Sequence, residues 1–277
     1  MTQIDKSRFE WIGSDSARRE GISRPSTTFW KDAIGRLMKN KVAVVCFFII
    51  VLLILSCIVV PFFSPFESRE QHLGEVNKGF MTVCTDSRYE GQHHVHYFGT
   101  DNLGRDLFLR AFEGGRVSLM IAFAAVFVNL IVGLIYGGIS GYIGGAVDTI
   151  MMRIVEIVNG IPYLIVVILL MMVLPKGIFT MVVAYGITGW TGMARLVRGQ
   201  VLQLKSQEYI VAAEAMGAKS SRIIAKHLIP NALSVIIINV TLAIPSAIFT
   251  EAFLSYIGLG VPVPQPSWGV LAKGGQD

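Results

Sequence analysis

Residues 42–60 read VAVVCFFIIVLLILSCIVV, a run without one charged side chain. A helix of this length rises about 28 Å, enough to cross the hydrocarbon core of a bilayer. A second uncharged run covers residues 117–145. Of the 277 residues, 53% are hydrophobic and 16% are charged, whereas soluble domains usually carry about 25% charged residues. The sequence therefore predicts an all-α protein that crosses a membrane several times.

Five membrane spans can be placed on the apolar runs. They are expected at about 42–62, 117–143, 155–174, 178–194 and 232–254. Pro162 interrupts the third span and Pro245 lies inside the fifth, which membrane helices tolerate when neighbouring helices satisfy the freed backbone groups. We therefore predict a packed, polytopic transmembrane helix bundle.

Lysine and arginine set the expected orientation, because they are enriched on the cytoplasmic side of membrane spans. The N-terminal segment 1–41 carries nine of them and is expected in the cytoplasm. The first span at 42–62 then leads to an external loop at 63–116 and to a membrane core domain at 117–277. Five spans leave the tail after residue 255 outside, whereas an even number would return it to the cytoplasm. These basic residues also account for the net charge of +5 without a nucleic-acid partner.

A polar stretch, SQEYIVAAEAMGAKSSRIIAKHLIPN at 206–231, interrupts the apolar runs inside a predicted cytoplasmic loop at 195–231. Apolar residues recur there at the spacing of one helical face: Tyr209, Ala212, Ala213 and Met216. Gly217 can end this helix with a positive φ. The pattern alone leaves two interpretations open, an amphipathic loop on the membrane surface or a docking element for another protein.

A second short helix is expected after Gly217. Ser220 or Ser221 can cap its start, and Pro230 is expected to end it. The polar stretch is thus predicted to be a helix–turn–helix that leads into the fifth span.

The order of residues in this stretch resembles the EAA loop of ABC importer permeases, which reads roughly E-A-A, three residues, G, nine residues and I-x-L-P. The alanines, the glycine and the final proline match that spacing, while His227 and Ile229 depart from its ending. The leading glutamate is displaced, as in the peptide-transporter branch. The resemblance implies coupling helices that seat in a groove on an ATPase subunit. The residues it implicates are Glu208, Tyr209, Ala212, Ala213, Glu214, Met216, Gly217 and Pro230.

Further segments between residues 36 and 272 resemble the C-type transmembrane subunit of oligopeptide and dipeptide ABC importers. Residues 96–110, HYFGTDNLGRDLFLR, are similar to its H-x-x-G-T-D-x-x-G-R-D segment. The matching residues are His96, Gly99, Thr100, Asp101, Gly104, Arg105 and Asp106. Two later segments supply Asp148, Arg153, Arg195 and Arg198. Family members normally have six spans, one more than the five counted.

The resemblance implies a type I, binding-protein-dependent importer in a bacterial cell membrane. This chain would form half of the translocation pathway with a homologous B-type permease. Two ATP-binding subunits, which hold ATP and Mg²⁺, and an extracellular or periplasmic peptide-binding protein would complete the assembly. Peptide, pheromone and nickel importers share these motifs, so the cargo stays open among them.

Catalytic motifs are absent from the sequence. No Gly-Lys pair occurs, which excludes a Walker A loop, and neither G-x-S-x-G nor H-E-x-x-H is present. The chain is therefore expected to be non-catalytic and to bind no cofactor. An ATP-independent secondary transporter is an alternative, although the spans contain no charged relay for a proton-coupled carrier.

Three smaller features complete the sequence-based expectations. His93, His94 and His96 suggest a metal site, since imidazole binds transition metals, but a polar external loop is the favoured interpretation and no metal is predicted. The glycines at 133, 137 and 141 have GxxxG spacing, which favours close helix packing within the chain or against a partner. Glu251 is an ionisable residue near a span end, for which hydrogen bonding between helices or an interfacial position is favoured over a functional role.

Overall fold

The computed structural model describes residues 29–85 and 94–275. The chain divides into two units, Met1–Leu53 and Ile54–Asp277. The first unit contains α1 (Phe29–Lys39) and the start of α2 (Lys41–Phe63). The side chain of Asn40 accepts a hydrogen bond from the Ala43 N–H at 3.2 Å, so α2 begins with a capped end before its uncharged run.

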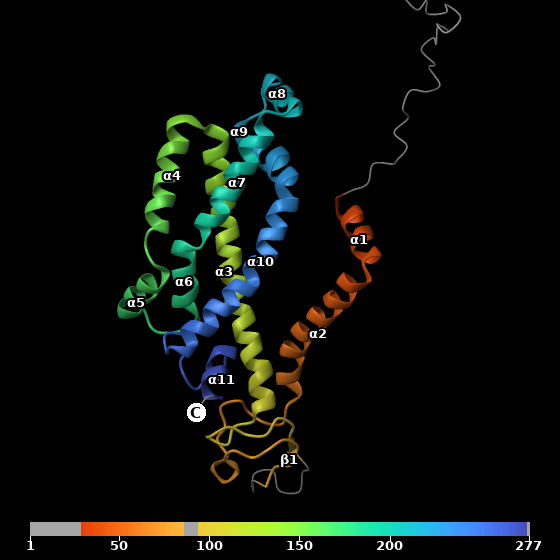
Figure 1. The fold of residues 1–277 in the computed structure, drawn as a ribbon, viewed down its shortest axis with the longest axis vertical. Coiled ribbons are helices and arrows are strands. Elements are labelled where there is room, and N and C mark those ends of the chain that lie inside the picture. The colour runs from red at the N-terminus through yellow and green to blue at the C-terminus, as the bar shows by residue number, and fades with distance from the viewer. Residues whose placement is uncertain (1–28, 86–93, 276–277) are drawn as a thin grey trace, which may run out of the picture. The chain divides into compact units, whose positions relative to one another are not determined.

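The second unit contains a small sheet and a set of packed helices (Figure 1). Its first part holds the rest of α2, the 3₁₀ helix η3 (Leu73–Glu75) and the antiparallel strands β1 (Thr82–Val83) and β2 (Val95–His96). Its helices are α3 (Leu107–Ile143), α4 (Gly145–Asn159), α5 (Tyr163–Val173), α6 (Ile178–Thr188), α7 (Trp190–Lys205), α8 (Glu208–Ala215), α9 (Ser220–Ile223), the π-helical η5 (Ile224–Leu228), α10 (Ile229–Tyr256) and α11 (Trp268–Gly274).

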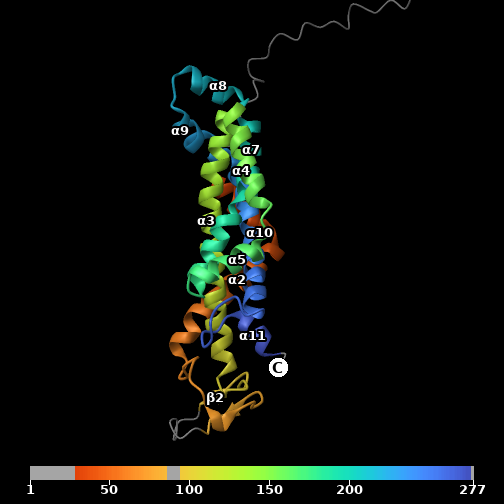
Figure 2. The ribbon, with the colours of Figure 1, turned by 90° about the vertical axis from the view of Figure 1, so that its left-hand side faces the viewer.

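Helix α3 is the long axis of the second unit. Its 37 residues extend over about 55 Å, longer than the roughly 30 Å core of a bilayer. The two-stranded sheet lies at one end of α3 and helices α8 and α9 lie near the other (Figures 1 and 2). The predicted external loop and the predicted cytoplasmic loop are therefore found at opposite ends of this unit.

Glycines on one face of α3 allow α7 to pack closely. Gly133, Gly137 and Gly141 are four residues apart and share a helix face. A Cβ atom at Gly137 would lie 2.3 Å from the carbonyl oxygen of Ala194 in α7, so only glycine fits there. The glycine pattern therefore serves packing within this chain.

The helices confirm an all-α, multi-pass membrane protein. Within the described residues, α2, α3 and the continuous stretch Ser220–Tyr256 are each long and apolar enough to cross a membrane, and the bent pair of α4 and α5 would make a fourth crossing. The fourth expected span, at 178–194, is divided between two helices at Gly189. Within the described residues, the third and fourth expected spans therefore each consist of two helices.

Two helix bounds differ from the expected loops and spans. Helix α3 begins at Leu107, inside the expected external loop, because the side chain of Asp106 accepts the N–H of Leu109 and caps it. The third expected span is broken, since α4 and α5 are bent by 77° around Gly160-Ile161-Pro162. Proline lacks the N–H that a helix needs and disfavours helical geometry in the residue before it.

Candidate functional site

The candidate coupling loop consists of α8, a turn at Gly217 and α9. Gly217 has a φ of +78°, as the sequence predicts. Its N–H donates to the Glu214 carbonyl, and the Ala218 N–H donates to the Ala213 carbonyl. These two hydrogen bonds form the Schellman motif, which satisfies carbonyl groups at a helix end. The turn after α8 is therefore defined by the backbone itself.

One side of α8 is anchored in the core of the second unit. Ile210 is fully buried and Ala213 is 6% exposed. Ile210 belongs to a cluster of buried apolar side chains drawn from α7, α9, η5 and α10: Val197, Val201, Ile223, Leu228, Ala232 and Ile236. The position of α8 is thus coupled to both helices that flank the loop.

The other side of α8 is open. Tyr209 is 41% exposed and Met216 is 82% exposed, and Ala212 is exposed between them. The expected stripe is therefore divided, because Ala213 faces the core while the other three residues face outward. Glu208, in the first turn, is also exposed.

Glu214 is held within the chain. Its carboxylate accepts a hydrogen bond of 3.0 Å from the Tyr142 hydroxyl at the end of α3. Lys205, at the end of α7, donates to the Tyr142 carbonyl at 2.6 Å and lies over the tyrosine ring. Glu214 therefore helps to fix α8 on α3, alongside its apolar anchor.

Helix α9 differs from its prediction at both ends. No serine side chain caps it, and Lys219 is the residue that precedes its first turn. Pro230 does not end it, because the chain continues through η5 into α10 as one helical stretch, Ser220–Tyr256. The Ile229 N–H reaches back to the Ile224 carbonyl in a wider π turn, which accommodates the proline ring in the next position.

Asp148 and Arg198 join α4 to α7. The carboxylate of Asp148 pairs with two nitrogens of the Arg198 guanidinium and also accepts the Ser140 hydroxyl of α3. Such bidentate pairs are directional as well as strong. The pair therefore ties three helices together near the coupling loop.

The two remaining arginines of the resemblance have different surroundings. Arg153 pairs with Glu156 on the exposed face of α4, and a surface pair of this kind contributes little stability. Arg195 is exposed on α7.

We call the opposite end of the unit, residues 64–85 and 94–106, the head. His96 is fully buried there, with Nδ1 2.7 Å from Asp106 Oδ2 and Nε2 3.0 Å from Glu75 Oε2. Phe66 stacks on its ring at 4.4 Å. Burial alone would lower the pKa of His96, but the hydrogen bonds to Asp106 and Glu75 outweigh it and raise the pKa. The imidazole therefore links two carboxylates.

Both carboxylates, Asp106 and Glu75, also accept hydrogen bonds from further donors. Asp106 also caps α3 through its second oxygen. Burial would raise the pKa of Glu75, but hydrogen bonds from the Thr85 N–H, the Thr85 hydroxyl, Lys78 and the Cys84 thiol lower it to about 2. The interior of the head is thus an extended network of charged hydrogen bonds.

The turn after β2 explains the other motif residues in the head. Gly99 and Gly104 have φ values of +77° and +72°, and a Cβ at Gly104 would lie 2.0 Å from the His72 carbonyl oxygen. Asp101 accepts hydrogen bonds from the Arg105 side chain and N–H. These bonds overcome the effect of burial and lower the pKa of Asp101. Thr100 contributes its hydroxyl, which donates to the Glu75 carbonyl.

A pocket of about 460 Å³ opens beside the break between α4 and α5. Its polar lining comes from α4, α5, α6, α7 and α10: Asn159, Tyr163, Tyr185, Thr188, Thr191 and Thr250. None of the described lining residues is charged. The side-chain polar groups of the pocket are therefore hydroxyls and one amide, next to the apolar Val158, Ile161 and Pro162 at the irregular backbone.

Sequence reasoning missed how the tail packs. Glu251 is fully buried and accepts hydrogen bonds of 2.7 Å from the hydroxyls of Ser118 and Ser255. The Trp268 N–H, at the start of α11, donates to Ser118, and its indole donates to the Ala111 carbonyl. Glu251 thus forms the hydrogen bonds between helices that were expected of it, and it joins α3, α10 and the tail.

Two of the three histidines that suggested a metal site, His94 and His96, have other contacts in the structure. His93 lies outside the described residues, and both ring nitrogens of His96 face carboxylates. His94 packs edge-on against Phe66. Of the two histidines of this cluster that the structure describes, His96 is thus engaged by carboxylates and His94 contacts an aromatic ring.

Comparison with protein families identifies two matches. The family described as "Binding-protein-dependent transport system inner membrane component" matches residues 129–275, and the "N-terminal TM domain of oligopeptide transport permease C" matches residues 28–79. Together they cover parts of both structural units.

Several curated proteins are similar over nearly the whole chain. The oligopeptide transport system permease protein OppC of Bacillus subtilis is 48% identical over 275 residues, covering 99% of this chain and 86% of that protein. The dipeptide transport system permease protein DppC of the same organism is 46% identical, covering 92% and 76%. OppC of Escherichia coli K12 is 42% identical, covering 98% and 86%. A solved inward-facing structure of the MetNI methionine ABC transporter matches with 22% identity and a TM-score of 0.48, over 53% of this chain and 74% of that one.

Proposed function

This chain belongs to the family of binding-protein-dependent transport system inner membrane components, and we propose that it is the permease subunit of an ATP-driven peptide importer. It forms one half of the translocation pathway and carries no catalytic site for ATP hydrolysis. Its relatives named above are permease proteins of oligopeptide and dipeptide transport systems, which supports a peptide as the cargo.

The observation that carries this proposal is the two-sided character of α8. Ile210 and Ala213 hold the helix on the core, while Tyr209, Ala212 and Met216 stay exposed. Exposed apolar side chains of this kind mark contacts with another protein. A soluble ATPase subunit that accepts α8 in a groove would cover them, and the small Ala212 side chain would allow a close approach.

The path from α8 to the membrane is short and stiff. Helix α8 passes through the Schellman turn at Gly217 into the continuous helix Ser220–Tyr256, which has 37 residues. Thr250, near the far end of this helix, lines the pocket at the break between α4 and α5. Movement of α8 by an ATPase would therefore move one wall of that pocket.

The chemistry of the pocket favours a peptide over a metal ion. Peptide groups are neutral and polar, and hydroxyl and amide side chains can donate to them or accept from them. A nickel ion would require imidazole, thiolate or carboxylate ligands, and none of these is among the described lining residues. The same neutral lining suits peptides of many sequences.

The proposed assembly follows from this role. A homologous B-type permease completes the pathway, two ATP-binding subunits hold ATP and Mg²⁺, and an extracellular or periplasmic binding protein delivers the peptide. The membrane is a bacterial plasma membrane, with the N-terminal segment and the coupling loop in the cytoplasm. The residues proposed to meet the ATPase are Glu208, Tyr209, Ala212, Met216 and Gly217, while Ala213, Glu214 and Pro230 support them from within the chain.

A charge placed on the exposed side of α8 tests the coupling role. Ala212→Arg should reduce both co-purification of the ATPase subunits and ATP-dependent peptide uptake by roughly tenfold or more, because an unpaired charge would be buried in the contact. Gln203→Arg is the matched control, since it adds the same charge on the exposed face of α7. Uptake is measured in proteoliposomes that contain the complete complex and its binding protein.

Three results would contradict the proposal in different ways. Unchanged uptake by Ala212→Arg would exclude α8 as the coupling contact. Uptake by the permeases without ATPase subunits would indicate a secondary transporter. Uptake of Ni²⁺ in place of peptide would identify a nickel importer, the alternative that the sequence leaves open.

A further inference from the structure

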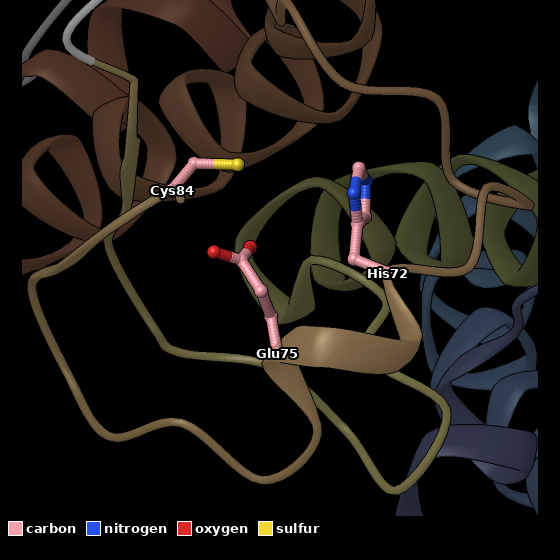
Figure 3. Close-up of side chains that lie close together, drawn as sticks. All are labelled: His72, Glu75 and Cys84. Atoms are coloured by element: carbon pink, nitrogen blue, oxygen red, sulfur yellow. The ribbon is translucent and has the colours of Figure 1, made fainter. Parts of the chain in front are cut away.

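Three buried side chains in the head face a common space: His72, Glu75 and Cys84 (Figure 3). One ligand atom from each, a ring nitrogen, a carboxylate oxygen and the sulfur, lies within 4.8 Å of the others. The residues are 2%, 2% and 8% exposed. We propose that they form a binding site for a transition-metal ion of the Zn²⁺ type.

The local structure brings these residues together without a long loop. His72 is the residue before η3 and Glu75 is its last residue, with the Glu75 N–H bonded to the His72 carbonyl at 2.7 Å. Cys84 directly follows β1, and its N–H donates to the His94 carbonyl at 2.8 Å. The backbone at each of the three residues is hydrogen-bonded, so fixed segments of the chain hold the three side chains in place.

The donor types select the class of metal. Imidazole and thiolate suit Zn²⁺ and similar ions, whereas Mg²⁺ and Ca²⁺ prefer oxygen ligands alone. In tetrahedral sites with bonds of about 2.0–2.3 Å, ligand atoms lie about 3.5 Å apart. The cluster would therefore contract by about 1 Å around the ion, and the thiol proton of Cys84 would pass to solvent.

A fourth ligand is available at the edge of the cluster. The Glu70 carboxylate lies 3.8 Å from His72 Nε2, and its side chain is 20% exposed. It therefore lies where an ion could enter from solvent. Four protein ligands would make a closed site, which is typical of structural zinc.

The groups that hydrogen-bond to Glu75 are of the kind that surround and orient the ligands of a metal site. His96 holds one carboxylate oxygen at 3.0 Å and is itself held by Asp106 at 2.7 Å. Outer hydrogen bonds of this kind orient metal ligands. The other oxygen accepts hydrogen bonds from Lys78 at 3.1 Å and from the N–H and hydroxyl of Thr85; the Lys78 side chain is 25% exposed, so it can turn toward solvent when an ion adds positive charge. The ion would tie η3 to β1, beside the capped start of α3.

Cobalt spectroscopy on the full-length chain tests this site. Co²⁺ is added to metal-stripped protein in which Cys46→Ser and Cys57→Ser leave Cys84 as the sole thiol. We expect one Co²⁺ per chain with a thiolate charge-transfer band, and displacement of the band by one equivalent of Zn²⁺. The band can arise only from Cys84 in this protein, so the result does not depend on whether a Cys84 variant folds.

Ligand variants provide the second measurement. Cys84→Ser should abolish the band, and His72→Asn should weaken Zn²⁺ binding by roughly 100-fold or more, since loss of an outer partner alone costs roughly 10–100-fold. The absence of a thiolate band in the single-cysteine protein would overturn the proposal. Zn²⁺ binding that keeps its affinity in Cys84→Ser would overturn it as well.

Discussion

The head and the coupling loop lie at opposite ends of the same unit, and their side chains have opposite surroundings. In the head, charged groups are buried and paired with one another, as His96 is between Glu75 and Asp106. In the coupling loop, apolar side chains such as Tyr209 and Met216 are left exposed. The charged groups of the head thus find partners within the chain, whereas the coupling loop presents a surface suited to another protein.

This difference predicts what mutations will do at each end. Removal of one member of a buried charged network leaves its partner uncompensated, so changes in the head should lower stability. Changes on the open side of α8 remove no internal contact, so they should affect assembly and transport while stability stays the same.

The largest effect is expected from Asp106→Ala. The change removes the cap of α3 and leaves the buried His96 with one carboxylate, which should cost about 3–5 kcal/mol of unfolding free energy. Thermal unfolding of the purified chain in detergent measures it. Asp32→Ala is the control, because it breaks an exposed pair with Arg36 and should cost less than about 1 kcal/mol. Equal effects of the two changes would refute the contrast between buried and exposed pairs.

Two variants of α8 separate its inner side from its outer side. Ile210→Ala should lower stability by about 2–5 kcal/mol, because a fully buried side chain leaves a cavity. Met216→Ser should change stability by less than about 0.5 kcal/mol, since the side chain is 82% exposed, but it should weaken ATPase co-purification. A stability loss in Met216→Ser similar to that in Ile210→Ala would show that α8 has no free side.

The glycine face of α3 allows a test of how closely α7 packs on the helix that joins the two ends. Gly137→Ala should cost about 1–3 kcal/mol, because the added methyl group would meet the Ala194 backbone. Gly192→Ala in α7 is the matched control. No described heavy atom lies within 4 Å of its Cβ position, so alanine there should raise stability by up to about 1 kcal/mol. Stabilisation by both changes would contradict the close contact between α3 and α7.

The smallest predicted effect is a difference in acid sensitivity between the two ends. Hydrogen bonds from Arg105 lower the pKa of Asp101 in spite of its burial, and Arg110 lies 3.7 Å from the same carboxylate. A lowered pKa stabilises the folded state above the ordinary value of 3.8, and this stabilisation is lost as the pH falls through the folded pKa. After correction for the intrinsic pH dependence of exchange, the protection of amides in the head should therefore fall in acid, and fall less in Asp101→Asn, while the protection of α8 stays unchanged. An equal loss of protection in the variant would exclude Asp101 as the cause.

The sequence predicts the nature of the coupling loop better than its bounds. The positive φ at Gly217 follows from glycine chemistry and is confirmed, because only a residue without a Cβ adopts that conformation at little cost. The prediction that α9 ends at Pro230 is wrong. The helical stretch continues because the π turn of η5 accommodates the proline, which has no N–H to donate. The division of the stripe, with Ala213 inside, depends on neighbours in α7 and α10 that periodicity cannot identify.

The head shows what a linear pattern leaves out. The sequence drew attention to His93, His94 and His96 because they are adjacent, but His96 is engaged by carboxylates from two other segments. The potential metal ligands His72, Glu75 and Cys84 are spread over residues that no spacing motif connects. The fold of η3 and β1 brings them together, so no short pattern could have indicated them.

By itself, the sequence determined the class of this protein, because an uncharged run of sufficient length has few stable places outside a membrane. It also predicted the turn at Gly217, since a positive φ depends on local backbone chemistry, whereas the capping of α3 by Asp106 emerged only from the structure. Only the tertiary structure decided which side of α8 is buried, which helix meets the glycines of α3 and which side chains gather in the head. Those outcomes depend on contacts between residues far apart in the chain, and local propensity contains no information about such partners.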